Sequence, residues 1–437
     1  MSVISGVSRT RREYSLRDNV LFRNYGILVR GIVFVLILCI PFISCSQSTY
    51  LYRDGKSEYK IVAHTNVEEI NSIAHNLRED LKKVGLVHLE ISNDFNASGR
   101  KIVLSVSDSV HLAHAYIMTR LTGDVEFVIQ EIDGDLFIVS NTVEGLSHAV
   151  SEFSSKYLKV DKLTPNKEAH SYIGKLDIKN ISYLGKPHFS HRLIYTSEAE
   201  DPAYRSFHKL QAFQGKDNHL WGGAWGHTFF RFVPPSNFYK TYPEFYSLIN
   251  GKRIPEQLCL SNESVVHQVK TALSVMIERD PSSKYWFVGQ EDNDSHCECD
   301  RCSKIDNDNG SKAGSLLNFV NQIALAFPEK TIVTLAYGET QKAPRRIRPV
   351  DNVMIMFCTS GDFNRVTPLE QQNINIILDP WLQKTSNIMI WDYISNFKHT
   401  LFPLQNLTAI GENIKFFRKE GGEGIFRTRQ YLWRGGI

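Results

Sequence analysis

The feature that most constrains the fold is a series of short apolar segments, beginning near residue 185, that alternate with stretches of helical periodicity. Such alternation is typical of parallel strands joined by crossover helices. Eight segments have the length and composition of strands: 189–195, 219–225, 257–261, 285–290, 331–337, 352–357, 387–391 and 424–428. Eight strands are what a (β/α)8 barrel requires, so residues 185–437 are predicted to form a TIM-type barrel.

Two features of this predicted barrel are irregular. Its second strand contains Gly222 and Gly223, and glycine weakens the interior of a strand. The sequence stops at Ile437, soon after the eighth strand segment. The barrel is therefore predicted to be incomplete at its C-terminus, without its last helix.

A second folded unit is predicted ahead of the barrel, over residues 57–162. Strand-like segments alternate there with two helical patterns, at 67–84 and 142–158. The pair Asp133-Gly134 lies between two apolar runs and predicts a hairpin, because glycine accepts positive φ. We interpret this unit as a small α/β domain without catalytic residues, flanked by linkers at 46–56 and 163–184.

The first 45 residues are predicted to be an export segment. Basic residues precede an apolar run at 31–43, as in a signal peptide, and the run is short for a membrane span. It ends in Phe42-Ile43-Ser44-Cys45-Ser46, which is similar to a bacterial lipoprotein cleavage box with Cys45 as the lipidated residue. The alternative is an uncleaved anchor. Both place the chain outside the cytoplasm, as a periplasmic or outer-membrane and cell-surface lipoprotein.

Composition narrows the class of partner. Charged residues make up 22% of the 437 residues and the formal net charge is only +3, which argues against nucleic acid. Aromatic residues reach 11%, in keeping with a site that stacks on sugar rings. The expected partner is an oligosaccharide or, as the family resemblance described below implies, the glycan of a glycoprotein.

Candidate catalytic residues follow the fourth predicted strand. Glu291 and Asp292 come directly after the apolar segment 285–290, and catalytic groups of such barrels lie where strands end. Glycoside cleavage needs one carboxyl group to protonate the leaving oxygen and a second group to supply or orient the nucleophile. The alternative is an acidic loop that only caps a turn.

Other strand ends supply candidate substrate-binding residues. An aromatic face, a carboxylate and a phenol at the mouth of a barrel suit a sugar, although each alone is also compatible with packing at the barrel rim. The predicted set is Arg192, Trp225, His227, Tyr337, Trp391, Asp392 and Tyr393.

The densest polar cluster is the run from His296 to Cys302. Cys297, Cys299 and Cys302, with the neighbouring His296, have the residue types of a closed structural zinc site. A disulfide from Cys302 to Cys297 or Cys299 is the alternative. Either reading makes the cluster structural, so no cofactor is expected to be required for catalysis.

Several ordered motifs resemble a known family. They are His219-Leu220-Trp221, Trp225-Gly226-His227, Tyr242-Pro243-Glu244-Phe245-Tyr246, Gln257-Leu258-Cys259-Leu260-Ser261-Asn262, Asp292 with Cys297-x-Cys299-x-x-Cys302, and Leu335-Ala336-Tyr337. Together they are similar to the domain of unknown function 4838, part of which resembles glycoside hydrolase family 163. The preceding unit resembles the N-terminal domain found ahead of β-hexosaminidase and α-glucuronidase barrels.

The resemblance implies an endo-β-N-acetylglucosaminidase that acts on N-glycans by substrate-assisted, retaining hydrolysis. It implies Glu291 as acid/base, Asp292 as the group that orients the substrate acetamide, and Tyr393 as a donor to the acetamide oxygen. The hexosaminidase pair has the order Asp-Glu, the reverse of this chain, so the division of roles stays open. Alternatives are an α-glucuronidase-like exo-glycosidase, in which Arg192 contacts a substrate carboxylate, and a non-catalytic glycan-binding lipoprotein.

Overall fold

The computed structural model describes residues 50–106, 115–212, 220–223, 225–359, 365–394, 405–422 and 424–428. The predicted export segment, with its lipidation site Cys45, lies outside these residues. Within the described part of the chain, no helix is both long and apolar enough to cross a membrane.

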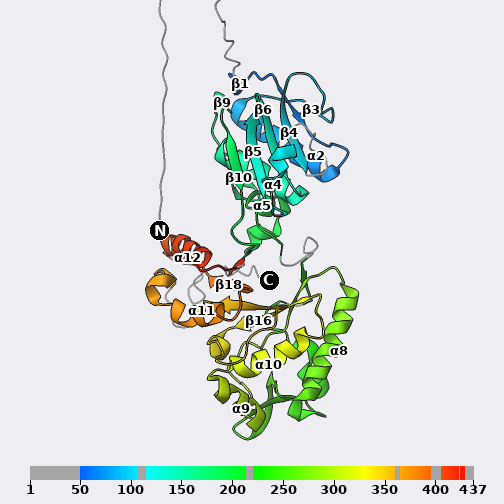
Figure 1. The fold of residues 1–437 in the computed structure, drawn as a ribbon, viewed down its shortest axis with the longest axis vertical. Coiled ribbons are helices and arrows are strands. Elements are labelled where there is room, and N and C mark those ends of the chain that lie inside the picture. Colours follow the sequence, from blue (N-terminus) through cyan, green and yellow to red (C-terminus); the bar gives the residue numbers. More distant parts are fainter. Residues whose placement is uncertain are drawn as a thin grey trace, which may run out of the picture. The chain divides into compact units, whose positions relative to one another are not determined.

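The first folded unit is an α/β structure on a mixed sheet (Figure 1). In the described residues the strand order is β10-β5-β6-β4-β2-β3. These strands are β2 (Tyr59–Val62), β3 (Ile91–Ser92), β4 (Arg100–Val106), β5 (Phe127–Ile132), β6 (Asp135–Ser140) and β10 (Ser182–Gly185). The predicted hairpin joins β5 to β6. Asp133 and Gly134 have φ of 52° and 87°, as a two-residue type I′ turn requires.

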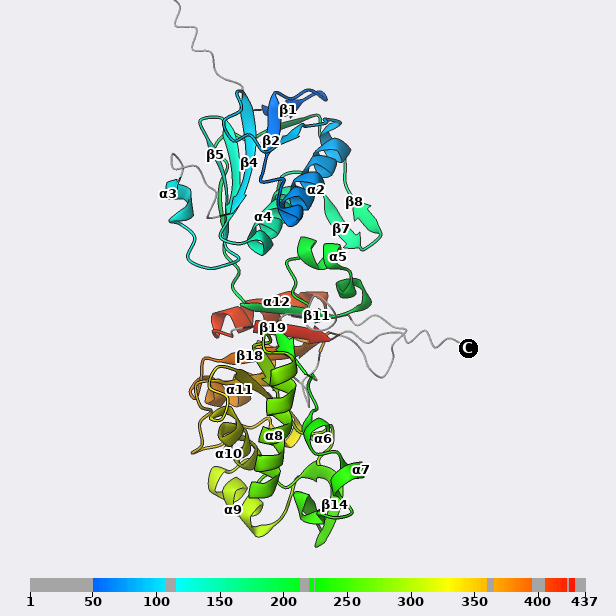
Figure 2. The same ribbon diagram turned by 90° about the vertical axis from the view of Figure 1, so that its right-hand side faces the viewer.

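Helices α2 (Glu68–Gly85) and α4 (Val143–Lys156) cover one face of this sheet, and α3 (Ala115–Met118) lies on the other (Figure 2). Both long helices lie where the sequence pattern predicts them. The apolar side chains of α2 that repeat at helical spacing are buried: Ile70, Ile73, Ala74, Leu77, Leu81 and Val84. α4 begins where the Thr142 hydroxyl accepts the Gly145 N–H at 3.1 Å, a cap that contributes about 1 kcal/mol.

Strands also occur in the two segments that were predicted to be linkers. β1 (Tyr50–Arg53) pairs with β9 (Lys175–Asp177), and β7 (Asp161–Thr164) pairs with β8 (Lys167–Ala169). β10 adds to the edge of the mixed sheet beside β5. The α/β unit therefore includes residues on both sides of 57–162. These strands are too short, and too charged on their open faces, to produce an apolar pattern in the sequence.

The second unit is built on a parallel sheet, as the alternating pattern predicts. In the described residues its order is β11-β19-β18-β17-β16-β15-β12, and every adjacent pair is parallel. The strands are β11 (His191–Tyr195), β12 (Trp221–Gly222), β15 (Tyr285–Phe287), β16 (Thr331–Ala336), β17 (Val353–Cys358), β18 (Ile388–Tyr393) and β19 (Gly424–Thr428). The pairing of the first strand with the last is that of a barrel.

The two faces of this sheet have different neighbours. Alternate side chains form an interior cluster that includes Leu193, Phe287, Leu335, Met356 and Met389. The other side chains pack against a layer of helices, some of which flank the sheet in Figure 2. The longer helices of this unit are α8 (Glu263–Arg279), α9 (Asp300–Asn309), α10 (Ala313–Ala324), α11 (Asn375–Leu382) and α12 (Leu407–Lys419). This is the two-layer arrangement of strands and crossover helices that the sequence predicts.

The glycines of the second strand have a packing role. A Cβ on Gly222 would lie 2.4 Å from Cζ2 of Trp286, and Gly223 has φ of 68°. Trp286, on the neighbouring strand, is almost fully buried. The strand is short and glycine-rich because this large ring occupies the space beside it.

The predicted third barrel strand, 257–261, is wrong. Its first two residues end β14 (Lys252–Leu258), which forms an antiparallel hairpin with β13 (Tyr246–Ile249). Asn250 and Gly251 have φ of 48° and 75° and make the turn. In the described residues no strand lies between β12 and β15 in the parallel sheet, and β11 does not pair with β12. The Asn-Gly pair was an available hairpin signal.

Short helices occupy the remaining connections. They are η3 (Ser197–Glu200), α5 (Pro202–Phe207), α6 (Phe229–Phe232), α7 (Pro235–Phe238), η4 (Pro243–Phe245), η5 (Gly338–Thr340) and η6 (Leu369–Gln372). α6 and η5 matter for the site, because each follows a strand that neighbours β15 in the sheet.

Candidate active site

Aromatic side chains gather where the interior face of the parallel sheet ends. Tyr337 directly follows β16, Trp391 and Tyr393 belong to β18, and Trp225 follows β12. All four are partly buried against the interior cluster. The ring centroids of Trp225 and Trp391 are 6.4 Å apart, and those of Trp391 and Tyr393 are 6.1 Å apart with 26° between their planes. The four predicted aromatic residues thus pack on one cluster and form one wall, and each of them is partly exposed.

The two candidate carboxylates begin the loop that follows β15. The strand ends at Phe287, and the chain has no regular structure from there to α9. Strand alternation therefore does not force the two side chains to opposite faces. Instead they reach the two neighbours of β15. Glu291 contacts the segment after β12, and Asp292 contacts the segment after β16.

Each carboxylate accepts one defined hydrogen bond. The backbone N–H of Phe230, in α6, donates to Oε1 of the partly buried Glu291 at 2.8 Å. The phenol of Tyr337 donates to Oδ1 of the exposed Asp292 at 2.8 Å. Hydrogen bonds to a charged acceptor are stronger than neutral ones and fix its orientation. The two groups are therefore held side by side with different environments.

The two phenols near Asp292 remain protonated donors. Burial, and then the hydrogen bond to Asp292, raise the pKa of Tyr337 well above its usual value. Burial raises the pKa of Tyr393 as well, and the neighbouring Cys358 and Tyr337 add to the increase, while Arg365 opposes it. The guanidinium of Arg365 lies 5.1 Å from the Tyr393 ring centroid. Both phenols can donate hydrogen bonds at neutral pH, and neither can serve as a base.

His227 lies beside the loop of residues 288–299, which contains Glu291 and Asp292 and is called the carboxylate loop below. Its Nδ1 is 2.6 Å from the carbonyl oxygen of Gln290. Because a carbonyl only accepts, Nδ1 carries the proton and Nε2 is left as the acceptor. The His227 ring centroid is 6.0 Å from that of Tyr337, so this predicted residue belongs to the same group.

Arg192 and Asp392 do not face the aromatic wall. On β11 the interior face carries Leu193, and the Arg192 guanidinium donates to the carbonyl oxygens of Phe189 and Lys209 at 2.7 and 2.8 Å. Asp392 lies between two interior-facing residues of β18, is only 2% exposed, and accepts the Thr359 hydroxyl at 2.9 Å. We correct both expectations to structural roles, because strand alternation turns these side chains to the opposite face.

One residue of the site had no predicted role. Gln257, in β14, is 2% exposed. Its Oε1 accepts the N–H of Glu291 at 3.1 Å, and its Nε2 donates to the carbonyl oxygen of Glu291 at 2.7 Å. Nε2 also lies 3.2 Å from the carbonyl oxygen of Asn293. The sequence contained one indication of this role. Gln257 begins an apolar run that continues as Leu258-Cys259-Leu260, and a polar amide buried in such a run needs hydrogen-bond partners.

The predicted cysteine cluster is present and has a fourth member. The sulfur atoms of Cys259, Cys297, Cys299 and Cys302 all lie within 4.8 Å of one another. Cys259 was not predicted to belong, and His296 is not part of the group. Hydrogen bonds from Cys297 and Cys302 lower the pKa of the Cys259 thiol below its usual value. Among the residues that the structure describes, these four cysteines form the group that could hold a metal ion.

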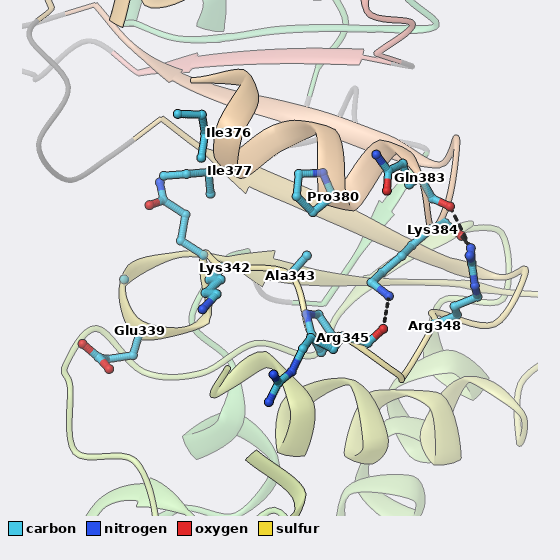
Figure 3. Close-up of a pocket in the computed structure, with 13 residues that line it drawn as sticks. Glu339, Lys342, Ala343, Arg345, Arg348, Ile376, Ile377, Pro380, Gln383 and Lys384 are labelled. Carbon is cyan, nitrogen blue, oxygen red and sulfur yellow. Dashed lines mark hydrogen bonds between the residues drawn. The ribbon is translucent and has the colours of Figure 1, made fainter. Parts of the chain in front are cut away.

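A cavity of about 710 Å³ lies apart from the two carboxylates, between the segment after β16 and α11 (Figure 3). Its lining includes the cations Lys342, Arg345, Arg348 and Lys384, and it does not include Glu291 or Asp292. Three of the cations are engaged with the backbone, and Arg345 donates to the Asn307 carbonyl oxygen at 3.2 Å. Lys384 donates to the Arg345 carbonyl at 3.1 Å and Arg348 to that of Gln383 at 2.8 Å. These bonds anchor the segment that begins at Tyr337.

The fold and the strand-end residues define an α/β protein of the barrel type whose mouth carries paired carboxylates and an aromatic wall. The sequence profile of the family described as a domain of unknown function (DUF4838) matches residues 162–435. The chain belongs to this family, which confirms the expected membership. No curated protein matches the sequence.

Solved structures of glycoside hydrolases show a distant likeness. Streptomyces plicatus N-acetyl-β-hexosaminidase is 12% identical over 87% of this chain and 83% of its own, with a TM-score of 0.47. The family 20 β-N-acetylhexosaminidase of Streptomyces coelicolor A3(2) is 12% identical over 86% and 82%, with a TM-score of 0.46. A family 115 4-O-methyl-α-glucuronidase with specificity for decorated arabinogalactans is 12% identical over 86% of this chain, with a TM-score of 0.45. The chain spans 54% of that glucuronidase.

Proposed function

We propose that the chain is a glycoside hydrolase whose catalytic carboxylates are Glu291 and Asp292. One observation carries the proposal: the exposed Asp292 is oriented by the Tyr337 phenol at 2.8 Å, at the end of a parallel sheet and beside partly exposed aromatic rings. The carboxyl ends of parallel strands are where barrel enzymes place their chemistry. Two adjacent carboxyl groups, held by different partners, provide the two roles that glycoside cleavage needs.

The proposed substrates are β-linked N-acetylglucosaminides, cleaved with retention. The acetamide oxygen of the sugar attacks the anomeric carbon while the bond from that carbon to the leaving oxygen breaks, and an acid donates a proton to the leaving oxygen. Water then opens the oxazoline intermediate and returns a proton to the acid/base. We assign the acid/base role to Glu291 and the orientation of the acetamide N–H to Asp292. The second oxygen of Asp292 suits that role, since Tyr337 holds Oδ1.

The neutral phenol of Tyr393 is proposed to donate to the acetamide oxygen. Its ring centroid lies 6.1 Å from that of Trp391, in the same aromatic wall, which supports this placement. Trp225 and Trp391 offer ring faces for a sugar, and His227 offers an acceptor nitrogen to a hydroxyl group.

The finer proposal is endo-acting release of N-glycans from glycoproteins by an exported lipoprotein, as the family 163 resemblance suggests. Metabolic labelling with a fatty acid, in wild type and Cys45→Ala, tests the anchor.

The first experiment incubates the purified chain with a complex N-glycoprotein and determines product masses. An endo-acting enzyme releases a glycan shortened by one N-acetylglucosamine, which stays on the protein. Glu291→Gln and Asp292→Asn are each expected to abolish release. Glu278→Gln, a carboxylate on the exposed surface of α8, is the matched control and is expected to retain activity. Binding without turnover by the wild type would favour a glycan-binding protein instead.

A second experiment separates the two roles. An aryl N-acetylglucosaminide with an acidic leaving group needs little protonation, so loss of the acid/base spares its cleavage step far more than that of a natural linkage. Glu291→Gln is expected to keep measurable activity on the aryl substrate and to lose it on the glycoprotein. Asp292→Asn is expected to lose both. The opposite pattern would exchange the two assignments, and full activity of both variants would refute the site.

A further inference from the structure

The four sulfur atoms of the cysteine cluster come from segments that are distant in the sequence. Cys259 follows β14, Cys297 and Cys299 belong to the loop after β15, and Cys302 lies in the first turn of α9. The Cys259 and Cys299 sulfurs are 3.7 Å apart, and all four sulfurs lie within 4.8 Å of one another. The cluster therefore connects the β13–β14 hairpin, the carboxylate loop and α9.

These distances fit a metal ion better than a disulfide. Zn²⁺ binds thiolates at about 2.3 Å in a tetrahedron, which places sulfur atoms about 3.8 Å apart. A disulfide bond would need about 2.05 Å. Three of the four cysteines are buried and Cys299 is partly buried, so the site is largely shielded from solvent. Four soft sulfur ligands in a closed site are typical of structural zinc.

Donors around the sulfurs match thiolate ligands. The N–H of Leu248 lies 3.4 Å from the Cys297 sulfur, and a guanidinium nitrogen of Arg253 lies 3.7 Å from it. The Ser261 hydroxyl lies 3.5 Å from the Cys299 sulfur, to which it can donate, and its oxygen accepts the Cys302 thiol at 3.1 Å. Zn²⁺ with four thiolates carries two negative charges, and such donors stabilise that charge and orient the ligands.

We propose that Cys259, Cys297, Cys299 and Cys302 bind one structural Zn²⁺ that fastens the carboxylate loop to the β13–β14 hairpin. Binding replaces four thiol protons with the metal ion. With four protein ligands the metal has no open position and takes no part in bond cleavage. His296 is not a ligand.

The proposed metal acts on the same loop as Gln257. That residue lies two positions before Cys259 and holds the backbone of Glu291. The hairpin therefore contacts the loop at its start, through Gln257, and the proposed metal fixes it at Cys297 and Cys299. Loss of the metal should weaken this second contact and leave it to the hydrogen bond from the Glu298 N–H to the Leu248 carbonyl oxygen, at 2.8 Å. The metal proposal itself stands without the proposed activity.

The test measures zinc by mass spectrometry of elements in the full chain, purified without a metal-affinity step and dialysed against a weak chelator. One zinc per wild-type chain is expected. Cys259→Ser should lose most of it, whereas His296→Ala and Cys358→Ser should retain it; Cys358 is a buried cysteine outside the cluster. Replacement of zinc by Co²⁺ should give the visible bands and the sulfur-to-cobalt charge transfer of a tetrahedral thiolate site.

Three results would overturn the proposal, and the first two do not depend on the folding of a variant. The first is a folded wild-type chain that contains no zinc and does not take up Zn²⁺ or Co²⁺ after reduction. The second is a peptide map of the untreated wild type that shows disulfides among the four cysteines. Zinc that stays bound in Cys259→Ser but leaves in His296→Ala would replace the fourth thiolate by the imidazole, and would equally refute the site as proposed.

Discussion

Replacement of Gln257 by leucine should disable the carboxylate loop without touching either carboxylate. Leucine has nearly the same volume as glutamine and suits a side chain that is 2% exposed. It cannot accept the Glu291 N–H, at 3.1 Å, or donate to the Glu291 carbonyl oxygen, at 2.7 Å. The contact to the carbonyl oxygen of Asn293, at 3.2 Å, is lost with them.

The expected cost follows from these contacts. A net contribution of about 1 kcal/mol for each of two good hydrogen bonds, with the added penalty of backbone groups left unpaired in a partly buried site, gives about 2–4 kcal/mol of unfolding free energy. Displacement of a catalytic group by about 1 Å costs on the order of 100-fold in rate. We therefore expect kcat/KM of Gln257→Leu to fall by about 100-fold, mainly through kcat.

The assay combines urea unfolding with steady-state kinetics on a glycoprotein or aryl substrate that the wild type cleaves. The matched control is Gln322→Leu, the same replacement on α10. There the amide donates to a single helical carbonyl, that of Asn318, at 2.9 Å. Its effect on stability should stay below about 1 kcal/mol, with kcat/KM unchanged. A Gln257→Leu chain with wild-type kcat/KM would refute the positioning role, whatever its stability.

Three further outcomes follow from the described contacts. Tyr337→Phe removes the donor to Asp292 Oδ1 and should lower kcat/KM about 10-fold or more, with little change in the urea midpoint. Burial lowers the pKa of His191 to about 4, so the folded state resists a proton that the unfolded state binds near pH 6.5. Stability should fall as pH drops from about 6.5 to about 4, and His191→Phe should make that slope shallower in unfolding titrations. Arg192→Met should lower the free energy of unfolding by about 1–3 kcal/mol and leave KM unchanged. A raised KM would show that Arg192 contacts the substrate.

Much of the fold could be predicted because it depends on periodicity. Six of the seven parallel strands, all except β12, and the helices α8, α10 and α12 produce apolar patterns in the sequence. The error at 257–261 has a physical cause. An apolar run of strand length does not reveal its partner, and here the Asn250-Gly251 turn pairs it locally, with β13. Pattern and length alone favoured a barrel strand.

The site was less predictable, because it depends on which face each side chain occupies. Position at a strand end selected Tyr337, Trp391 and Tyr393 correctly as neighbours. The same rule also selected Arg192 and Asp392, whose side chains point to the other face. Strand register decides between the faces, and a shift of one residue reverses them. The strand boundaries could not be located that finely from composition.

The conformation of the carboxylate loop could not be predicted from the sequence. The chain between β15 and α9 has no regular structure, so its conformation depends on contacts from elsewhere in the fold. Those contacts come from several segments: Gln257 holds the backbone of Glu291, Phe230 holds its carboxylate, and Tyr337 holds Asp292. Such contacts leave no local pattern in the sequence, because the partners are far apart along the chain; 34 residues separate Gln257 from Glu291. The candidate catalytic pair is thus positioned jointly by the β13–β14 hairpin, which holds the backbone, and by the segments after β12 and β16, which hold the carboxylates.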